Sequence, residues 1–270
     1  MDLYNDTSYT LSDILTKRYS TSFSMSMRLF PKEMRAHIAA IYGMVRLADE
    51  IVDTYTGADR ATLLDDFEKE VKAAVHRGYS TNPIIHSYAI TAKRYSISNS
   101  LVTAFFHSMR MDLTKQTYDQ ATYETYIYGS AEAVGLMCLY VFVDDIKLYR
   151  ILEKDAAHLG AGYQKVNFLR DIRADHESLD RWYFPFSSFE KFNETVKARI
   201  VRDIKKDFQA GHRSALKLPI SSRRAVLLSI RYYSLLLEKI ERTPAAVLKI
   251  KRIRVSTPRK LIFFIGALFQ

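Results

Sequence analysis

The chain has 270 residues, carries a formal net charge of +10 and is 48% hydrophobic by composition. Its length suits a single hydrophobic core, and its nine glycines and six prolines are too few for a turn-rich all-β fold. The single cysteine, Cys138, excludes an intrachain disulfide, and the seven histidines lack the spacing of a zinc site.

Apolar residues recur at helical spacing along almost the whole chain, which predicts helices rather than strands. The pattern breaks where turn-forming pairs occur, as at Thr56-Gly57 and Asn82-Pro83. In chain order, the expected helices cover residues 11–22, 32–55, 60–77, 83–95, 98–114, 123–143, 147–175, 189–215 and 221–243, with a shorter helix near the end. Since no repeat or linker divides the chain, we expect one all-α domain over residues 1–270.

The second expected helix carries an isolated group of charges. Arg46, Asp49, Glu50 and Asp53 are spaced i, i+3, i+4 and i+7, so they share one helix face. A solvent-exposed stripe would be the ordinary explanation. However, the rest of residues 38–52 is uncharged and mostly apolar. The pattern therefore favours a metal-binding or substrate-binding face.

A second polar face follows in the helix expected at residues 147–175. Gln164, Asn167, Asp171 and Asp175 recur at i, i+3, i+7 and i+11, which places them on one side of that helix. Two long helices therefore each present an Asp-x-x-x-Asp pair. We expect the two pairs to face each other.

Small residues cluster in and before these helices. Gly160 and Gly162 precede the second aspartate pair, and glycine inside a helix is costly unless another chain segment approaches closely. The segment 123–137 mixes aromatic residues with small ones, which suits either helix packing or a ligand chain.

Two facing aspartate pairs suit magnesium. Mg²⁺ prefers octahedral oxygen coordination, takes one or two carboxylates and fills its shell with water and phosphate oxygens. No EF-hand loop and no Glu-x-x-His pair of a di-iron bundle is present. Metal ions held in this way would stabilise a leaving diphosphate as its charge grows, which promotes cleavage of an allylic C–O bond.

The C-terminal third is strongly basic. From Lys191 onward the chain holds 19 lysines and arginines against five acidic residues. Such asymmetry indicates an anionic partner or a solvated basic face. The end of the chain combines basic residues with the apolar run 261–269, which would favour docking on an anionic membrane surface or packing on the core. No nucleic-acid recognition motif accompanies these charges, so we expect no nucleic acid partner. The basic residues before the run are Lys249, Lys251, Arg252, Arg254, Arg259 and Lys260.

Residues 1–10 are polar and lack the apolar core of a signal peptide, and the apolar runs near Val141 and at 261–269 are too short to span a bilayer. We therefore expect a cytoplasmic protein. The alternative is a cytoplasmic protein attached peripherally to the inner face of the membrane.

Several segments of the chain match, in the same order, those of the squalene and phytoene synthase family of head-to-head prenyltransferases. Within that family the chain most resembles bacterial phytoene synthases. One Asp-x-x-x-Asp pair is a weak signal, but the ordered set is specific and spans nearly the whole chain. The matching segments are 19–23 (YSTSF), 46–53 (RLADEIVD), 126–135 (YIYGSAEAVG), 164–175 (QKVNFLRDIRAD), 180–185 (DRWYFP) and 252–256 (RIRVS).

The resemblance implies an isoprenoid-synthase helical bundle around a central apolar pocket. It implies that Asp49, Asp53, Asp171 and Asp175 bind Mg²⁺ and diphosphate, with Mn²⁺ as a substitute metal. Asn167 matches a further metal ligand, and Tyr126 matches an active-site tyrosine. Tyr19 is a departure, because some members have histidine there. Substrate contacts are implied for Arg46, Gln164, Asn167, Arg170, Ser22, Phe23, Tyr233 and Arg252.

The implied reaction joins two prenyl diphosphates through a cyclopropylcarbinyl diphosphate. We expect two geranylgeranyl diphosphates to give phytoene, as in carotenoid biosynthesis, without NADPH. The alternative is a C30 product, dehydrosqualene or squalene, from two farnesyl diphosphates. A terpene cyclase or head-to-tail elongase fits the aspartate motifs poorly, and a non-catalytic helical membrane adaptor is a further alternative. The sequence does not define the oligomeric state.

Overall fold

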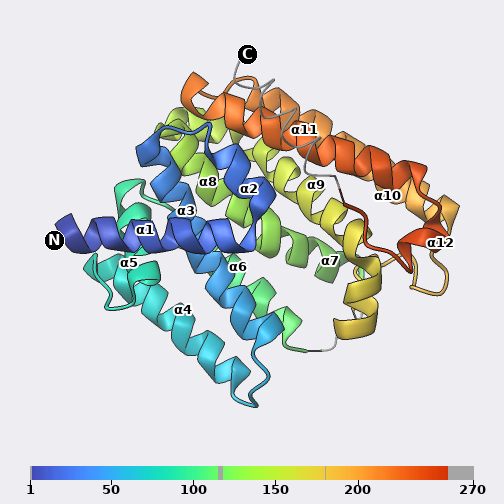
Figure 1. The fold of residues 1–270 in the computed structure, drawn as a ribbon, viewed down its shortest axis with the longest axis horizontal. Helices are drawn as coiled ribbons and strands as arrows, with labels where there is room; N and C mark the ends of the chain where they lie inside the picture. The colour runs from blue at the N-terminus through green and yellow to red at the C-terminus, as the bar shows by residue number, and fades with distance from the viewer. Residues whose placement is uncertain (1, 115–117, 180, 255–270) are drawn as a thin grey trace.

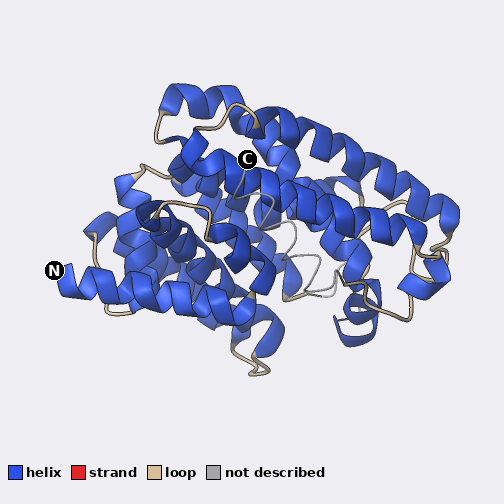
Figure 2. Cartoon of the chain, turned by 45° about the horizontal axis from the view of Figure 1, so that its top comes forward, coloured by secondary structure: helices blue, strands red, loops and turns tan. Residues whose placement is uncertain are grey.

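The computed structural model describes residues 2–114, 118–179 and 181–254, and every regular element in these ranges is a helix (Figures 1 and 2). This confirms the predicted all-α single-domain fold. The elements are α1 (Asp2–Tyr19), α2 (Thr21–Met27), α3 (Lys32–Asp49), η1 (Glu50–Thr54), α4 (Arg60–Arg77), α5 (Pro83–Arg94), α6 (Asn99–Asp112), α7 (Gln120–Ile127), η2 (Tyr128–Glu132), α8 (Ala133–Val143), α9 (Ile146–Leu179), α10 (Glu194–Ala215), α11 (Ile220–Arg242) and α12 (Ala245–Leu248).

Helix α1 begins at Asp2, well before the predicted start at residue 11. Its buried side consists of Ser8, Ser12 and Thr16, which are fully buried against neighbouring helices. The Ser12 hydroxyl lies 2.8 Å from the Ser87 hydroxyl on α5, so hydrogen bonding replaces apolar packing there. The prediction relied on apolar residues at helical spacing. Because the buried side of α1 is polar, its first turns lack that pattern, and the predicted helix began too late.

Two of the predicted long helices each contain a π-helical turn. The helix expected at residues 32–55 is α3 followed by the π-turn η1, and the helix expected at 123–143 is α7, the π-turn η2 and α8. A π-turn adds a residue to one turn and is frequent at functional sites. Each turn here contributes a side chain to the same large cavity, Asp53 from η1 and Ser130 from η2.

The long helix α9 packs against α8, α10 and η2 (Figure 1). A Cβ atom at Gly160 would lie 2.7 Å from the Ala131 carbonyl oxygen, and one at Gly162 would lie 2.8 Å from the Phe208 ring. These contacts confirm the close approach that the two glycines predicted. They fix the position of α9 just before its functional face.

The core consists of two clusters of buried apolar side chains. One is built mainly on α3, α5, α6 and α8, and the other on α9, α10 and α11 together with Tyr126, Tyr183 and Phe184. The large cavity lies between them, because Met109 of the first cluster and Phe168 of the second both line it. The fold thus places an open space where the two halves of its core meet.

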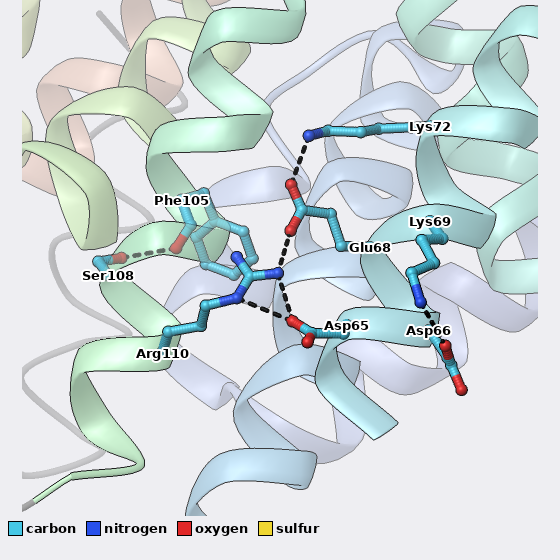
Figure 3. A network of polar contacts seen from close by, with 8 residues as sticks. All are labelled: Asp65, Asp66, Glu68, Lys69, Lys72, Phe105, Ser108 and Arg110. Atoms are coloured by element: carbon cyan, nitrogen blue, oxygen red, sulfur yellow. Dashed lines mark hydrogen bonds and ion pairs between the residues drawn. The ribbon is translucent and has the colours of Figure 1, made fainter. Parts of the chain in front are cut away.

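Helices α4 and α6 are tied together by a charged network (Figure 3). Arg110 on α6 donates from Nε and Nη2 to the Asp65 carboxylate on α4, at 2.9 and 2.6 Å, and also pairs with the buried Glu68. A buried carboxylate needs such a partner to offset its desolvation. Because Met109 and Asp112 flank this arginine and line the large cavity, the network fixes that side of the cavity wall.

The stretch Gln120–Val143 (α7, η2 and α8) is long and apolar enough to cross a membrane by length and composition alone. This corrects the prediction that the run near Val141 is too short, because the helix extends further toward the N-terminus than the apolar run itself. Half of its most apolar window is buried inside the protein, and the stretch packs on α6 and α9. Core packing therefore accounts for its composition.

Candidate active site

The large cavity, here called the aspartate cavity, has a volume of about 900 Å³. Its walls come from the end of α1, α3, η1, α6, α7, η2, α9 and α11, together with Ser20 and the segments 181–183 and 252–254. All four predicted metal-binding aspartates line it, and its walls are richer in polar side chains than the expected apolar pocket. The other predicted residues that line it are Arg46, Tyr126, Gln164, Asn167, Arg170, Tyr233 and Arg252.

The first aspartate pair lies where α3 passes into η1. Asp49 is the last residue of α3 and Asp53 lies within the π-turn. Arg46 Nη1 is 3.7 Å from the Asp49 carboxylate, while Nη2 of the same guanidinium pairs with Glu50. Burial raises the pKa of Asp49 to about 7; Arg46 opposes this rise and the Asp53 carboxylate adds to it. The Asp49 carboxylate thus lacks sufficient positive charge nearby.

The second pair lies on the uninterrupted helix α9. The Asp171 carboxylate accepts a hydrogen bond from Arg170 Nη2 at 2.6 Å and one from Arg252 Nη2 at 3.3 Å, and Arg252 Nε lies 2.7 Å from its Oδ1. One turn further on, burial raises the pKa of Asp175 to about 7, and the adjacent Asp171 carboxylate adds to the rise. One carboxylate of this pair is therefore neutralised by arginine, and the other is not.

Two charged residues that the sequence reasoning did not assign complete the acidic cluster. Arg181 Nη1 lies 3.2 Å from Asp53 Oδ1 and 3.5 Å from Asp112 Oδ1, and its Nη2 donates to the Asp112 carbonyl oxygen at 2.8 Å. Burial raises the pKa of Asp112 to about 7, against the opposing effect of Arg181. The predicted catalytic Tyr126 donates its hydroxyl to Asp112 Oδ2 at 2.8 Å.

The sequence could have indicated Arg181, because this residue lies in the segment 180–185 that matches the family. Asp112 had only the weak signal of one acidic residue at the end of an apolar stretch.

Aromatic side chains surround the polar groups. The Tyr233 hydroxyl donates to Asn167 Oδ1 at 3.5 Å, and the Tyr233 ring stacks on Tyr163 with centroids 4.1 Å apart. At Tyr19, the position where some family members have histidine, the ring lies 4.3 Å from the Arg46 guanidinium carbon. Such a cation–π contact holds the arginine over the cavity without neutralising it.

The remaining predictions fall outside the cavity walls. Phe23 is not a lining residue: its ring stacks on Tyr42, which lines the cavity, with centroids 5.3 Å apart. The side chain of Ser22 lies outside the described part of the structure. So do Arg259, Lys260 and the apolar run 261–269, on which the membrane-docking prediction depends.

The donor set of the aspartate cavity fits magnesium. Its free ligands are carboxylate and amide oxygens, and the raised pKa values of Asp49 and Asp175 mark carboxylates that lack a cation. Within residues 2–114, 118–179 and 181–254, no three His, Cys, Asp or Glu side chains form a complete metal site by themselves. This suits an ion that takes one or two carboxylates and completes its shell with water and ligand oxygens.

The fold matches solved structures of a dehydrosqualene synthase and a squalene synthase. A dehydrosqualene synthase crystal structure superposes with a TM-score of 0.82 at 16% sequence identity, covering 98% of this chain and 96% of that chain. The squalene synthase of Alicyclobacillus acidocaldarius gives a TM-score of 0.76 at 22% identity, covering 89% of this chain and 95% of that chain. At these identities the likeness concerns the fold alone.

The sequence itself gives the family. Residues 16–259 match the family described as Squalene/phytoene synthase, and the chain belongs to it. It is 32% identical over 178 residues to a presqualene diphosphate synthase of Zymomonas mobilis subsp. mobilis, covering 64% of this chain but only 58% of that protein. A phytoene synthase of Mycobacterium tuberculosis is 25% identical over 193 residues, covering 70% of this chain and 61% of that protein. A 15-cis-phytoene synthase of Synechococcus elongatus is 28% identical over 275 residues, covering 92% of this chain and 88% of that protein.

Proposed function

We propose that this protein condenses two identical prenyl diphosphates head to head. The observation that carries the proposal is the meeting of two aspartate pairs, from α3–η1 and from α9, at one cavity that five arginines also line. Carboxylates alone would repel a diphosphate, so the arrangement suits a ligand that arrives with metal ions. Arg46, Arg170 and Arg252 are placed to bind its phosphate oxygens directly. Membership of the squalene/phytoene synthase family supports the same chemistry.

The proposed reaction has two halves. One substrate loses diphosphate, its allylic C1 alkylates the double bond of the second substrate, and loss of a proton gives a cyclopropylcarbinyl diphosphate. That intermediate loses its diphosphate, rearranges and loses another proton to give the 1–1′ linked hydrocarbon. Bound Mg²⁺, for which Mn²⁺ would be the substitute, would neutralise the charge on each leaving diphosphate.

The residues of the cavity have separate parts in this proposal. Asp49, Asp53, Asp171, Asp175 and Asn167 would hold the metal. The arginines would hold the diphosphates. The Tyr126 hydroxyl, fixed by its hydrogen bond to Asp112, would face the reacting carbon atoms from the cavity wall.

For the substrate, we propose geranylgeranyl diphosphate and phytoene as product, without NADPH. The support is the 15-cis-phytoene synthase likeness, which extends along 92% of this chain. The alternative is a C15 substrate. It is supported by the identity to the presqualene diphosphate synthase and by a 4,4'-diapophytoene synthase of Staphylococcus haemolyticus, 25% identical over 199 residues. Attachment to a membrane surface remains a proposal that rests on the basic C-terminal third.

Product analysis by mass spectrometry tests both the proposed condensation and the proposed substrate. The purified full chain is incubated with farnesyl or geranylgeranyl diphosphate, with Mg²⁺ or with EDTA, and with or without NADPH. We expect a C40 hydrocarbon from geranylgeranyl diphosphate with Mg²⁺ and no NADPH. A C30 product alone would replace the substrate assignment, and product formed in EDTA would overturn the metal role. Absence of any condensed product from folded protein would overturn the proposed activity.

A further inference from the structure

A second cavity, here called the α10 cavity, lies between α7, α10 and the segment 184–186. Its volume is about 260 Å³, below the ~300–1,000 Å³ of sites for drug-sized ligands. It shares no lining residue with the aspartate cavity. Its walls are Gln120, Tyr123, Phe184, Phe186, Arg199, Ile200, Arg202, Asp203 and Lys206.

The α10 cavity has an apolar floor and a basic rim. Phe184 and Ile200 are buried at 2% exposure and Tyr123 at 8%, so rings and an aliphatic chain form the floor. Arg199, Arg202 and Lys206 are spaced i, i+3 and i+7 along α10, which places them on one helix face, and all three are exposed.

The rim cations are free to meet an anion. Among the described residues, neither Arg202 nor Lys206 has a carboxylate partner. Arg199 lies 3.8 Å above the Phe186 ring, a contact that leaves its guanidinium donors free. The one acidic lining residue, Asp203, shares Lys165 with Asp207, so three rim cations face one lining carboxylate. The excess positive charge at the rim favours an anion, which relieves the repulsion among the cations.

We infer that the α10 cavity binds a small phosphate ester, a diphosphate group at the basic rim with a short apolar chain on the aromatic floor. Arginine pairs are suited to phosphate because the guanidinium fork donates two parallel hydrogen bonds. The volume admits a C5 chain rather than the long chains of the proposed substrates. The diphosphate chemistry has two sources, inorganic diphosphate or a C5 prenyl diphosphate, and the apolar floor favours the second.

One short segment connects this cavity to the aspartate cavity. Phe184 lines the α10 cavity, while Tyr183 lines the aspartate cavity and stacks on Phe168 of α9 with centroids 3.9 Å apart. Two residues before Tyr183, Arg181 pairs with Asp53. A ligand that moves or rigidifies Phe184 therefore acts on residues of the acidic cluster, so occupancy of the α10 cavity would modulate the proposed turnover.

The chain contains a natural reporter for this site. Trp182 is its single tryptophan, its Nε1 donates to the Phe184 carbonyl oxygen at 2.9 Å, and its ring meets the Phe184 ring edge-on at 5.6 Å between centroids. We would titrate the full chain in EDTA with isopentenyl diphosphate and with inorganic diphosphate while following tryptophan fluorescence. Burial of the C5 chain should make isopentenyl diphosphate bind about tenfold more tightly.

Paired variants locate the response. The double variant Arg202→Gln/Lys206→Gln should weaken binding at least about tenfold. The matched double variant Lys205→Gln/Arg213→Gln removes two charges from the same helix outside the cavity and should leave it unchanged. Arg170→Gln, in the aspartate cavity, should also retain the response. Equal weakening by both double variants, loss of the response in Arg170→Gln, or no response at all would overturn the site. Inorganic diphosphate binding as tightly as isopentenyl diphosphate would overturn the role of the apolar floor.

The effect on turnover is a separate measurement, and only this part rests on the proposed function. Isopentenyl diphosphate added to the condensing enzyme should change kcat in the parent chain and in Lys205→Gln/Arg213→Gln, but not in Arg202→Gln/Lys206→Gln. Inhibition that persists in the rim variant would show competition in the aspartate cavity and would overturn the coupling. Fluorescence binding without any turnover would leave the site standing and would count against the proposed function alone.

Discussion

The two aspartate pairs of the aspartate cavity have the same spacing in the sequence but different surroundings. Asp171 on α9 is held by two arginines, whose nearest nitrogen atoms lie 2.6 and 2.7 Å from its carboxylate oxygens. Among the described residues, Asp49 on α3 pairs only with Arg46, at 3.7 Å, and that arginine also pairs with Glu50. The backbone differs as well, because the first pair spans the junction of α3 with a π-turn and the second lies in continuous α-helix.

This difference shows that the cavity is not electrostatically symmetric. On α9, arginine neutralises one carboxylate before any ligand arrives. On the α3 side, the partly buried Asp49 carboxylate keeps a pKa of about 7 because Arg46 offsets only part of its desolvation. Asp49 therefore gains more from a metal ion than Asp171 does, because Asp171 already pairs with two arginines. The partners within the pairs are reversed, since Asp53 pairs with Arg181 while Asp175 keeps a raised pKa.

Asp49→Asn and Asp171→Asn should both lower turnover by at least about 10²–10³-fold, because each removes charge that holds the metal and the leaving diphosphate. Helical content, measured by circular dichroism, should stay the same. Asp155→Asn, the same change on the outer part of α9 where Asp155 pairs with Arg213, is the matched control and should keep turnover. Retained turnover in Asp49→Asn or Asp171→Asn would show that the substituted carboxylate does not hold the metal.

The same two variants should change the stability of the metal-free protein in opposite directions. At pH 8 in EDTA, Asp49→Asn should stabilise by on the order of 1 kcal/mol, because it removes a buried charge with too little compensation. Asp171→Asn should destabilise by about 1–3 kcal/mol, because Arg170 and Arg252 lose their acceptor. Thermal unfolding would show these changes as shifts of roughly 2–4 °C per kcal/mol. Shifts of the same sign would contradict the asymmetry.

The dependence of stability on pH follows from the raised pKa values. Asp49, Asp112 and Asp175 have pKa values of about 7 in the fold, against an ordinary value of 3.8. Between these values the folded state binds more protons than the unfolded state, so stability falls as pH rises. We expect the melting temperature in EDTA to fall from pH 5 to pH 8, and the stabilisation by Mg²⁺ to be larger at pH 8.

Asp49→Asn is the control for this pH dependence. In EDTA, its melting temperature should fall less between pH 5 and pH 8 than that of the parent chain. A melting temperature in EDTA that rises from pH 5 to pH 8 would contradict the charge assignment of the cluster.

The sequence alone predicted that the aspartates of each pair share a helix face, but it did not predict which residues surround them. Spacing of i, i+4 places two side chains on one face of a helix whatever that helix packs against. Arg46 and Asn167 were found for the same local reason. The bond from Arg252 to Asp171 joins residues 81 positions apart, and the sequence did not predict it. The family resemblance implied only that Arg252 contacts the substrate.

The residues that the sequence reasoning missed are those whose neighbours are set by tertiary packing. Asp112 is one acidic residue at the end of α6, and Arg181 follows the end of α9. Only the fold brings them within 3.5 Å of each other. The π-turn at Glu50–Thr54 has no local sequence signature, and the polar buried side of α1 lacks the apolar pattern that marks a helix.

The smallest expected effect tests whether the second pair depends on both of its arginines. Arg252 is half-exposed, at 49%, so its bond to Asp171 is screened by solvent, and Arg170 remains as a partner after its removal. Arg252→Gln should therefore destabilise the metal-free protein by less than about 1 kcal/mol. It should raise KM for the prenyl diphosphate more than it lowers kcat, because the guanidinium would contact the phosphate in the ground state and the transition state alike. Destabilisation as large as that of Asp171→Asn would mean that Arg252, rather than Arg170, neutralises Asp171.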